Sequence, residues 1–260
     1  MEGRSISEAK QIKISISDII DFCFCPRYYD IKHKHCNEKN IKDYYDETLH
    51  TTFYHYLIAL QNGVLINSLE FLKKQWGEEW IKQKTNREII FTPSATSRDT
   101  HDNKRKMGID AIITFDKLMN EPQVPIVINM PYELKVTDKI TVIGVWEYIR
   151  EVPLQDNGHE FQIMKFRTEN NKFQVNRQRY HDLELTSAYI AFKKKFRNEA
   201  RLVYVDVYAK KIVPSFRGDK DIKDFVHTIQ SVAACLKHNI RCYSPDKKCY
   251  HCEYRDECLK

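Results

Sequence analysis

The chain has 260 residues, with 42 basic and 36 acidic side chains and a formal net charge of +6. This length allows a substantial hydrophobic core, and the small positive excess suits a polyanionic partner without specifying one. No apolar run reaches the roughly 20 residues of a membrane-spanning helix, and the first residues lack the apolar segment of a signal peptide. We therefore expect a cytoplasmic protein without membrane contacts, whose eight cysteines serve as metal ligands or buried thiols.

The apolar spacing predicts helices in the first part of the chain. A short helix begins near Ser17 and is interrupted by Pro26, and longer helices cover residues 41–60 and 66–83. The pattern then changes to short runs rich in β-branched residues. The runs REIIFTPSA, MGIDAIITF and PIVINMPYELKV predict consecutive strands of one sheet.

The second half of the chain combines strand and helix patterns. Residues 139–175 are ambiguous and contain the strand-like pieces TVIGVWEYI and FQIMKF. Residues 178–196 read as a helix, ARLVYVDVYAKKIVPSF as a strand or hairpin, and DIKDFVHTIQSVAACLK as an amphipathic helix. This order predicts an α/β fold with a central mixed sheet flanked by helices. We expect a helical N-terminal region (1–85), a core (86–215) and a C-terminal helix with a cysteine-rich end (216–260).

The predicted strands carry the most informative polar residues. Glu133 and Lys135 project from the same face of their strand because side chains alternate along a strand, and a neighbouring strand bringing Asp110 alongside would place two carboxylates and an ammonium in one pocket. Carboxylates that close repel each other unless a cation lies between them, and oxygen ligands favour Mg²⁺ or Mn²⁺. The alternative is that these residues are ordinary strand-edge charges joined by salt bridges.

Gly108-Ile109-Asp110 followed by Glu133-Leu134-Lys135 resembles the PD-(D/E)xK nuclease superfamily in its RecB-like branch. The resemblance implies a restriction-endonuclease-like core in which Asp110, Glu133 and the backbone carbonyl of Leu134 hold the metal. It also implies that Lys135 helps to activate the attacking water. A histidine on a helix before the sheet is a further ligand in this branch. His55 occupies that place and His50 is its competitor, while a histidine with a purely structural role is the alternative.

The C-terminal cysteines form a second motif, Cys249-x2-Cys252-x5-Cys258, in which the first pair presents two thiolates from one turn. Cys242, His251 or a distant cysteine are candidates for the fourth ligand. Cys25, which precedes Pro26 and Arg27, resembles the cysteine of RecB-like nucleases that carry an iron–sulfur cluster. The resemblance implies a 4Fe–4S cluster held by Cys25, Cys249, Cys252 and Cys258, which would staple the C-terminus to the N-terminal region. Zinc is the alternative metal, because four thiolates bind it equally well.

The ordered set of motifs is similar to the CRISPR-associated RecB-like exonucleases (the Cas-four family). The resemblance implies a Mg²⁺- or Mn²⁺-dependent deoxyribonuclease that hydrolyses single-stranded DNA ends and works with the CRISPR integrase when spacer precursors are trimmed. Arg27, Arg179 and Tyr189 are the candidate nucleic-acid contacts. The alternatives are a stand-alone phage, plasmid or repair nuclease of the same chemistry, and a non-catalytic nucleic-acid-binding module held together by zinc.

Overall fold

The computed structural model describes residues 11–35, 39–64, 67–86, 89–90, 100–119, 123–154, 158–168, 182–242, 249, 252 and 254–258. Its helices are α1 (Ile16–Phe24), α2 (Pro26–Lys34), α3 (Ile41–Gln61), α4 (Ser68–Asn86), α5 (His101–Leu118), α7 (Leu183–Phe196), α8 (Asp219–Lys237) and α9 (Arg255–Cys258). Its strands are β1 (Ile12–Ser15), β2 (Lys39–Asn40), β3 (Ile89–Ile90), β4 (Pro125–Thr137), β5 (Ile140–Pro153), β6 (His159–Arg167), β7 (Ala200–Asp206) and β8 (Lys211–Ser215).

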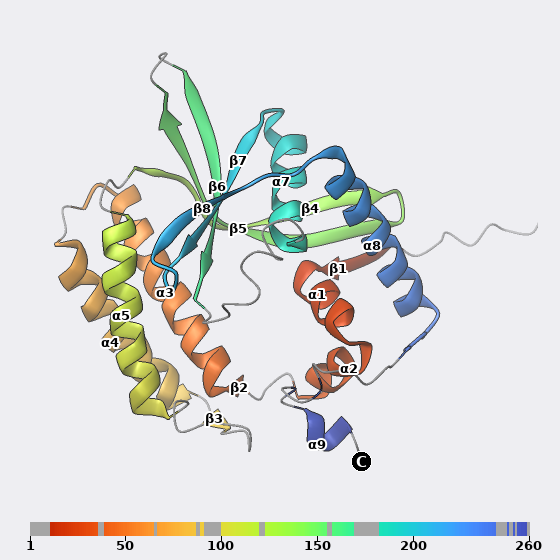
Figure 1. The fold of residues 1–260 in the computed structure, drawn as a ribbon, viewed down its shortest axis with the longest axis horizontal. Coiled ribbons are helices and arrows are strands. Elements are labelled where there is room, and N and C mark those ends of the chain that lie inside the picture. The colour runs from red at the N-terminus through yellow and green to blue at the C-terminus, as the bar shows by residue number, and fades with distance from the viewer. Residues whose placement is uncertain are drawn as a thin grey trace, which may run out of the picture.

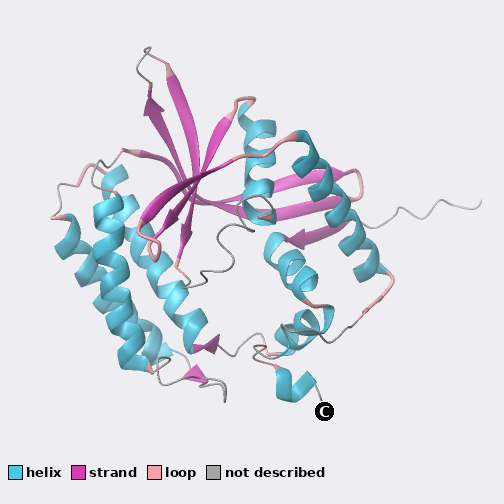
Figure 2. Ribbon diagram, in the orientation of Figure 1, coloured by secondary structure: helices cyan, strands magenta, loops and turns pink. Residues whose placement is uncertain are grey.

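The main sheet is mixed, and β5 lies at its centre (Figure 2). One edge of β5 pairs antiparallel with β4. The other edge pairs in parallel with β1 near its start and antiparallel with β6 near its end. The sheet continues from β6 to β7 in parallel and from β7 to β8 in antiparallel pairing. The predicted α/β fold, a mixed sheet flanked by helices, is confirmed.

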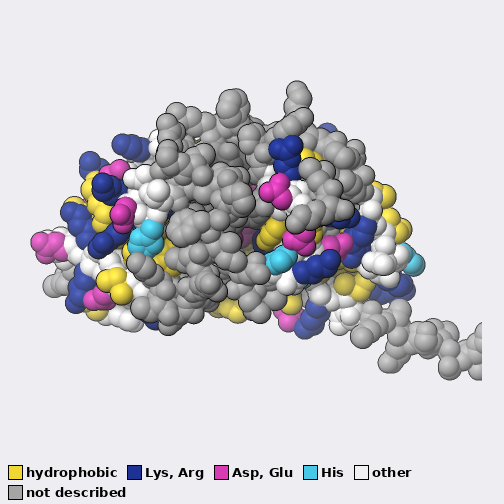
Figure 3. Space-filling model, turned by 90° about the horizontal axis from the view of Figure 1, so that it is seen from below, with side chains coloured by type: hydrophobic (Ala, Val, Ile, Leu, Met, Phe, Trp, Pro, Cys, Tyr) yellow, Lys and Arg dark blue, Asp and Glu magenta, His cyan; other side chains and the backbone are white. Residues whose placement is uncertain are grey.

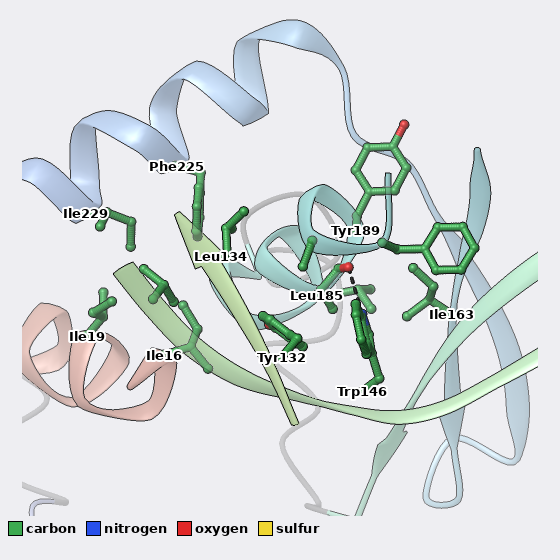
Figure 4. Close-up of a cluster of buried hydrophobic side chains, with 14 of the residues drawn as sticks. Ile16, Ile19, Tyr132, Leu134, Trp146, Ile163, Leu185, Tyr189, Phe225 and Ile229 are labelled. Carbon is green, nitrogen blue, oxygen red and sulfur yellow. Dashed lines mark hydrogen bonds between the residues drawn. The ribbon is translucent and has the colours of Figure 1, made fainter. Parts of the chain in front are cut away.

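Helices cover the sheet with two separate hydrophobic clusters. In the first, shown in Figure 4, residues of α1, α7 and α8 pack on β4 and β5, and Leu134, Trp146 and Phe225 are almost fully buried. In the second, α3, α4 and α5 pack together and against β6 and β7. Figure 1 shows these two helical groups on opposite sides of the view. The α5 helix belongs to the expected 86–215 core, yet it packs with the helices of the expected N-terminal region.

The prediction of a strand at MGIDAIITF is wrong, because this run lies inside α5. Thr100 caps the helix by accepting a hydrogen bond from the Asn103 N–H at 3.3 Å. Ala111, Ile112 and Phe115 are buried at helical spacing, and the Phe115 ring stacks on Phe53 of α3 with 3.9 Å between ring centroids. Packing between helices therefore outweighs the local strand preference of the isoleucines.

The strand predicted at REIIFTPSA is described only as β3, which pairs with β2 in a separate two-stranded sheet, so its predicted place in the main sheet is wrong. The other predicted elements are close to those observed. The helix predicted from Ser17 is capped instead by Ser15, whose side chain accepts from the Asp18 N–H at 3.0 Å. Pro26 ends that helix as predicted and also begins α2, where its missing N–H costs nothing. The hairpin β7–β8 and the helices α7 and α8 are confirmed.

Close contact between α4 and α5 depends on Gly108. A Cβ atom at this position would lie 2.1 Å from the ring of Trp76, whereas a Cβ at Gly77 of α4 would meet nothing within 4 Å. We expect Gly108→Ala to lower the free energy of unfolding by about 1–3 kcal/mol through overpacking. Gly77→Ala should raise it by roughly 0.5–1 kcal/mol, because alanine favours the helix. Urea denaturation of both variants tests this, and equal effects would contradict the proposed packing.

Candidate functional site at the fork between β5 and β6

Part of one edge of the central strand β5 has no neighbouring strand. Pairing with β1 ends at Ile143, and pairing with β6 begins at Tyr148. Residues 144–146 therefore pair only with β4, and the sheet forks between β1 and β6 over residues 144–147. A fork exposes backbone hydrogen-bonding groups inside the protein, and those groups must find other partners.

Glu147 supplies one such partner. Its carboxylate Oε2 accepts a hydrogen bond from the backbone N–H of Phe166 on β6 at 2.8 Å. The last β5–β6 residue pair is Tyr148 with Met164, so the Glu147 side chain takes over where the backbone ladder stops. A carboxylate is thus fixed at the apex of the fork.

Lys165 of β6 brings the N-terminus of α7 to the same place. Its Nζ forms an ion pair with Glu184 and lies 3.5 Å from Asp182 Oδ2. Asp182 caps α7 by accepting from the Leu185 N–H at 2.9 Å, and the Tyr204 hydroxyl donates to its other oxygen at 2.9 Å. The capping interactions hold Asp182 in place, and Lys165 therefore lies between two carboxylates of one helix start.

Burial and like charge change the protonation of this cluster. Burial, reinforced by the charge of Glu184, raises the pKa of Glu147 to about 8. Burial alone would lower the pKa of Lys165, but Asp182, Glu184 and Glu147 outweigh it and raise that pKa. Burial, with Lys165 nearby, lowers the pKa of His50 on α3 to about 4. At neutral pH the fork therefore holds a charged lysine, a neutral imidazole and a carboxyl group that still binds a proton.

Residues of β5, β6 and α7, including Glu147, Lys165 and Glu184, line a narrow pocket with room for about one water molecule. Within the described ranges, no three His, Cys, Asp or Glu side chains are grouped so as to hold a metal ion. Two carboxylates are sufficient for Mg²⁺, which keeps several waters and takes its remaining ligands from substrate phosphates. The carboxylate oxygens of Glu147 and Glu184 are the donor type that such an ion prefers, and the pocket would have to widen to admit the ion with its waters.

The structure does not bring Asp110 to Glu133 and Lys135. Asp110 is exposed on α5 and lines a groove formed with the β7–β8 turn. Glu133 is exposed on β4 and pairs with Lys13 at 2.9 Å, and Lys135 pairs with Asp138 at 2.9 Å. Leu134 is buried in the cluster of α1, α7 and α8 (Figure 4). The predicted site is not formed because Asp110, expected on a strand, lies on the helix α5.

The histidine and nucleic-acid candidates are also separated. His55 faces α4, with its Nδ1 2.8 Å from Gln75 Oε1, whereas His50 lies beside Lys165. Tyr189 is buried on α7 and donates to Glu199. Arg27 is exposed on α2, and Arg179 lies outside the described residues. Of these candidates, His50 alone is placed at the fork.

The cysteine-rich end meets the N-terminal region. Figure 1 shows α9 beside α2. The rings of Tyr28 and Tyr254 lie 5.3 Å apart between centroids, and His35 Nε2 lies 2.9 Å from Glu257 Oε2. The Cys252 N–H donates to the Cys249 carbonyl at 3.4 Å, a tight turn of the kind that metal-binding Cys-x-x-Cys pairs form. The described thiols are not gathered around one point, so a bound metal would have to draw them together.

Surface charge is mixed on the face drawn in Figure 3. Dark blue and magenta side chains alternate over the described residues there, without a continuous basic patch. None of the described helices is long and apolar enough to cross a membrane.

The fork residues carry a sequence signal that motif spacing does not use. Glu147 stands between Trp146 and Tyr148, and Lys165 stands between Met164 and Phe166, so each is a charged residue with large apolar residues on both sides. Charged residues are almost never fully buried unless they are paired. Such a pattern indicates a partner or a function for the charge.

No protein-family model matches the sequence, and no curated protein matches it. Among solved structures, the crystal structure of SSO0001 is similar over 96% of this chain and 86% of the other, at 11% sequence identity and a TM-score of 0.37. A likeness at this level assigns neither a family nor an activity to this chain.

The raised pKa of Glu147 predicts a pH-dependent effect on stability. Between the ordinary value of 4.5 and the folded value of about 8, the unfolded chain releases a proton that the folded chain keeps, so stability falls as pH rises through this window. Glu147→Gln removes that loss. We expect its free energy of unfolding, relative to the unmodified chain, to rise by a few kcal/mol, since each pKa unit corresponds to about 1.4 kcal/mol.

Urea denaturation across this pH range measures the difference. Glu133→Gln is the matched control, because its carboxylate is exposed. A constant difference between Glu147→Gln and the unmodified chain over the whole range would show that Glu147 titrates normally.

Proposed function

We propose that this chain is a metal-dependent deoxyribonuclease that hydrolyses phosphodiester bonds at single-stranded DNA ends, with its active site at the fork between β5 and β6. The observation that carries the proposal is the meeting of Glu147, Glu184 and Lys165, from three different elements, in one partly buried pocket. Two carboxylates can hold a divalent ion for phosphodiester hydrolysis, and a lysine can stabilise the charge that develops on the phosphate. The proposal keeps the chemistry that the sequence predicts and moves it to other residues.

Glu147 and Glu184 would hold Mg²⁺ or Mn²⁺, which supplies a water of lowered pKa and neutralises phosphate charge. Lys165, which pairs with Glu184, would be freed in part from this ion pair if Glu184 served as a metal ligand. The ammonium of Lys165 then donates to an oxygen of the phosphate and stabilises the charge that develops on it. His50 stays neutral beside it at physiological pH and therefore adds no positive charge to the site.

We also propose the 4Fe–4S cluster at Cys25, Cys249, Cys252 and Cys258, with zinc as the alternative metal. Contact of α2 with α9 supports this proposal, since it brings two distant cysteine-bearing segments together. Trimming of spacer precursors together with the CRISPR integrase belongs to the same proposal and rests on the sequence resemblance alone.

A non-catalytic nucleic-acid-binding module is the second candidate. It is favoured by the ion pairs that already neutralise Lys165 and by the narrowness of the pocket at the fork. In that case the cluster would be a structural core of buried charges.

Cleavage of end-labelled single-stranded DNA with Mn²⁺ separates the two candidates. We expect Lys165→Ala and Glu147→Gln to reduce the cleavage rate about 100-fold or more, because each removes a charge or ligand needed in the transition state. Lys135→Ala and Glu133→Gln are matched controls on β4 and should retain activity. Loss of activity in the β4 variants with full activity in the fork variants would restore the site predicted from sequence.

Metal analysis of purified protein tests the cysteine site. We expect Cys25→Ser to lose bound iron or zinc, because it removes the ligand contributed by the N-terminal region. Cys23→Ser, two residues earlier and exposed, should retain the metal. Equal metal content in both variants would remove Cys25 from the ligand set.

A further inference from the structure

A groove between α5 and the turn that joins β7 to β8 takes no part in the proposed nuclease site. Its volume is about 490 Å³, within the range of pockets that bind small molecules. Asp206 holds the turn, because its Oδ1 accepts from the Tyr208 N–H at 3.1 Å and from the Ala209 N–H at 2.7 Å. The Tyr208 hydroxyl lies 3.0 Å from the hydroxyl of Tyr45 on α3. The turn is therefore fixed in place opposite α5.

Thr114 of α5 lines this groove with a hydroxyl group. The residue is only 7% exposed, and its hydroxyl forms no hydrogen bond with any residue that the structure describes. Thr48 and Thr52 of α3, by contrast, donate to the carbonyl four residues earlier at 2.7 and 2.8 Å, a common arrangement for threonine inside a helix. A nearly buried hydroxyl without a protein partner indicates a ligand or an ordered water in the groove.

Charged side chains flank the Thr114 hydroxyl. Asp110 precedes Thr114 by four residues and Lys117 follows it by three, so the three side chains share one face of α5 and span about 10 Å along its axis. Lys210 lines the groove from the opposite turn. Within the described part of the chain, none of these three charged residues forms an ion pair. The groove thus offers two ammonium groups and a hydroxyl to an anion, and a carboxylate to a hydrogen-bond donor.

Apolar side chains form most of the remaining lining, from α5 and from the residue after β7: Met107, Ala111, Ile113, Leu118 and Val207. Such a surface can cover the sugar and the base of a nucleotide. A 5′-phosphate accepts hydrogen bonds from ammonium and hydroxyl groups, and the exocyclic amino group of cytosine donates to a carboxylate. The charged face of α5 is comparable in length with the separation of these two groups within one nucleotide.

We propose that this groove binds a nucleotide whose base carries an exocyclic amino group, with the 5′-phosphate at Lys117, Lys210 and Thr114 and the amino group at Asp110. An acidic peptide suits the groove less well, because Asp110 would repel it. The nucleotide can be free or can form the 5′ end of a DNA strand, since both carry the same groups. The site is separate from the fork and does not depend on the proposed nuclease function.

Titration calorimetry of the full-length chain with dCMP and dUMP, in the absence of divalent metal, tests the site. We expect dCMP to bind about tenfold more tightly, because dUMP lacks the amino group that donates to Asp110. Lys117→Ala and Thr114→Val should weaken dCMP binding by about tenfold, and Asp110→Asn should abolish the preference for dCMP. Lys106→Ala is the matched control, because Lys106 is exposed on α5 outside the groove, and it should bind dCMP normally.

The other measurements separate the groove from the fork and from a folding defect. Thr114→Val should keep the denaturation midpoint of the unmodified chain, because the change removes no hydrogen bond of the described residues. Lys165→Ala should bind dCMP normally, and loss of dCMP binding in this variant alone would place the nucleotide at the fork and overturn the groove site. A 5′-phosphorylated single strand that binds through Lys117 when dCMP does not would assign the site to a DNA end.

Two results would refute the proposal. One is that neither dCMP nor the 5′-phosphorylated strand binds in the absence of metal. The other is equal dCMP binding by Lys117→Ala and Lys106→Ala. Neither result bears on DNA cleavage at the fork, which the Lys165→Ala variant tests separately.

Discussion

The hydrogen bond from the Phe166 N–H to the Glu147 carboxylate is the interaction on which the candidate site depends. It stands where β5 leaves β6, so a side chain replaces a strand-to-strand backbone bond. A fork in a sheet is costly unless its exposed backbone groups are satisfied. Satisfying one of them with a carboxylate places a potential negative charge in the interior, and the surrounding charges follow from that placement.

The positive charge of Lys165 lies close to this carboxylate, and Lys165 in turn forms ion pairs with the acidic residues at the start of α7. Asp182 and Glu184 belong to the first turn of a helix, where negative side chains are favoured by the helix dipole and by capping. The same residues therefore stabilise the start of α7 and gather charged groups at the candidate site. Burial, reinforced by the charge of Glu184, raises the pKa of Glu147, so this residue retains a proton at neutral pH.

Sequence periodicity was sufficient for β4 to β8, α7 and α8, because alternation and the 3.6-residue repeat report which face is buried. It failed at α5, where Ile109, Ile112 and Ile113 favour a strand locally but Phe115 and Gly108 pack against Phe53 and Trp76 of other helices. Because of that error, Asp110 was predicted to lie beside Glu133 and Lys135. Contacts between distant segments decide such cases, and a local pattern does not contain them.

The residues that meet at the fork could not be predicted from the spacing of sequence motifs, for a similar reason. The fork exists because β1 and β6 share one edge of β5, although they are far apart in the chain. What the sequence did show is a charged residue between large apolar residues in each of two strands, Glu147 and Lys165. Their convergence on α7 depends on the path of the chain through three dimensions.

The most direct measurement is a crystal structure of the Lys165→Ala chain bound to Mn²⁺ and a short single-stranded DNA, with manganese located by its anomalous scattering. The account predicts manganese between Glu147 and Glu184, with a phosphate beside it at the fork. Manganese at Asp110 or Glu133 instead, with the fork free of both metal and DNA, would contradict it.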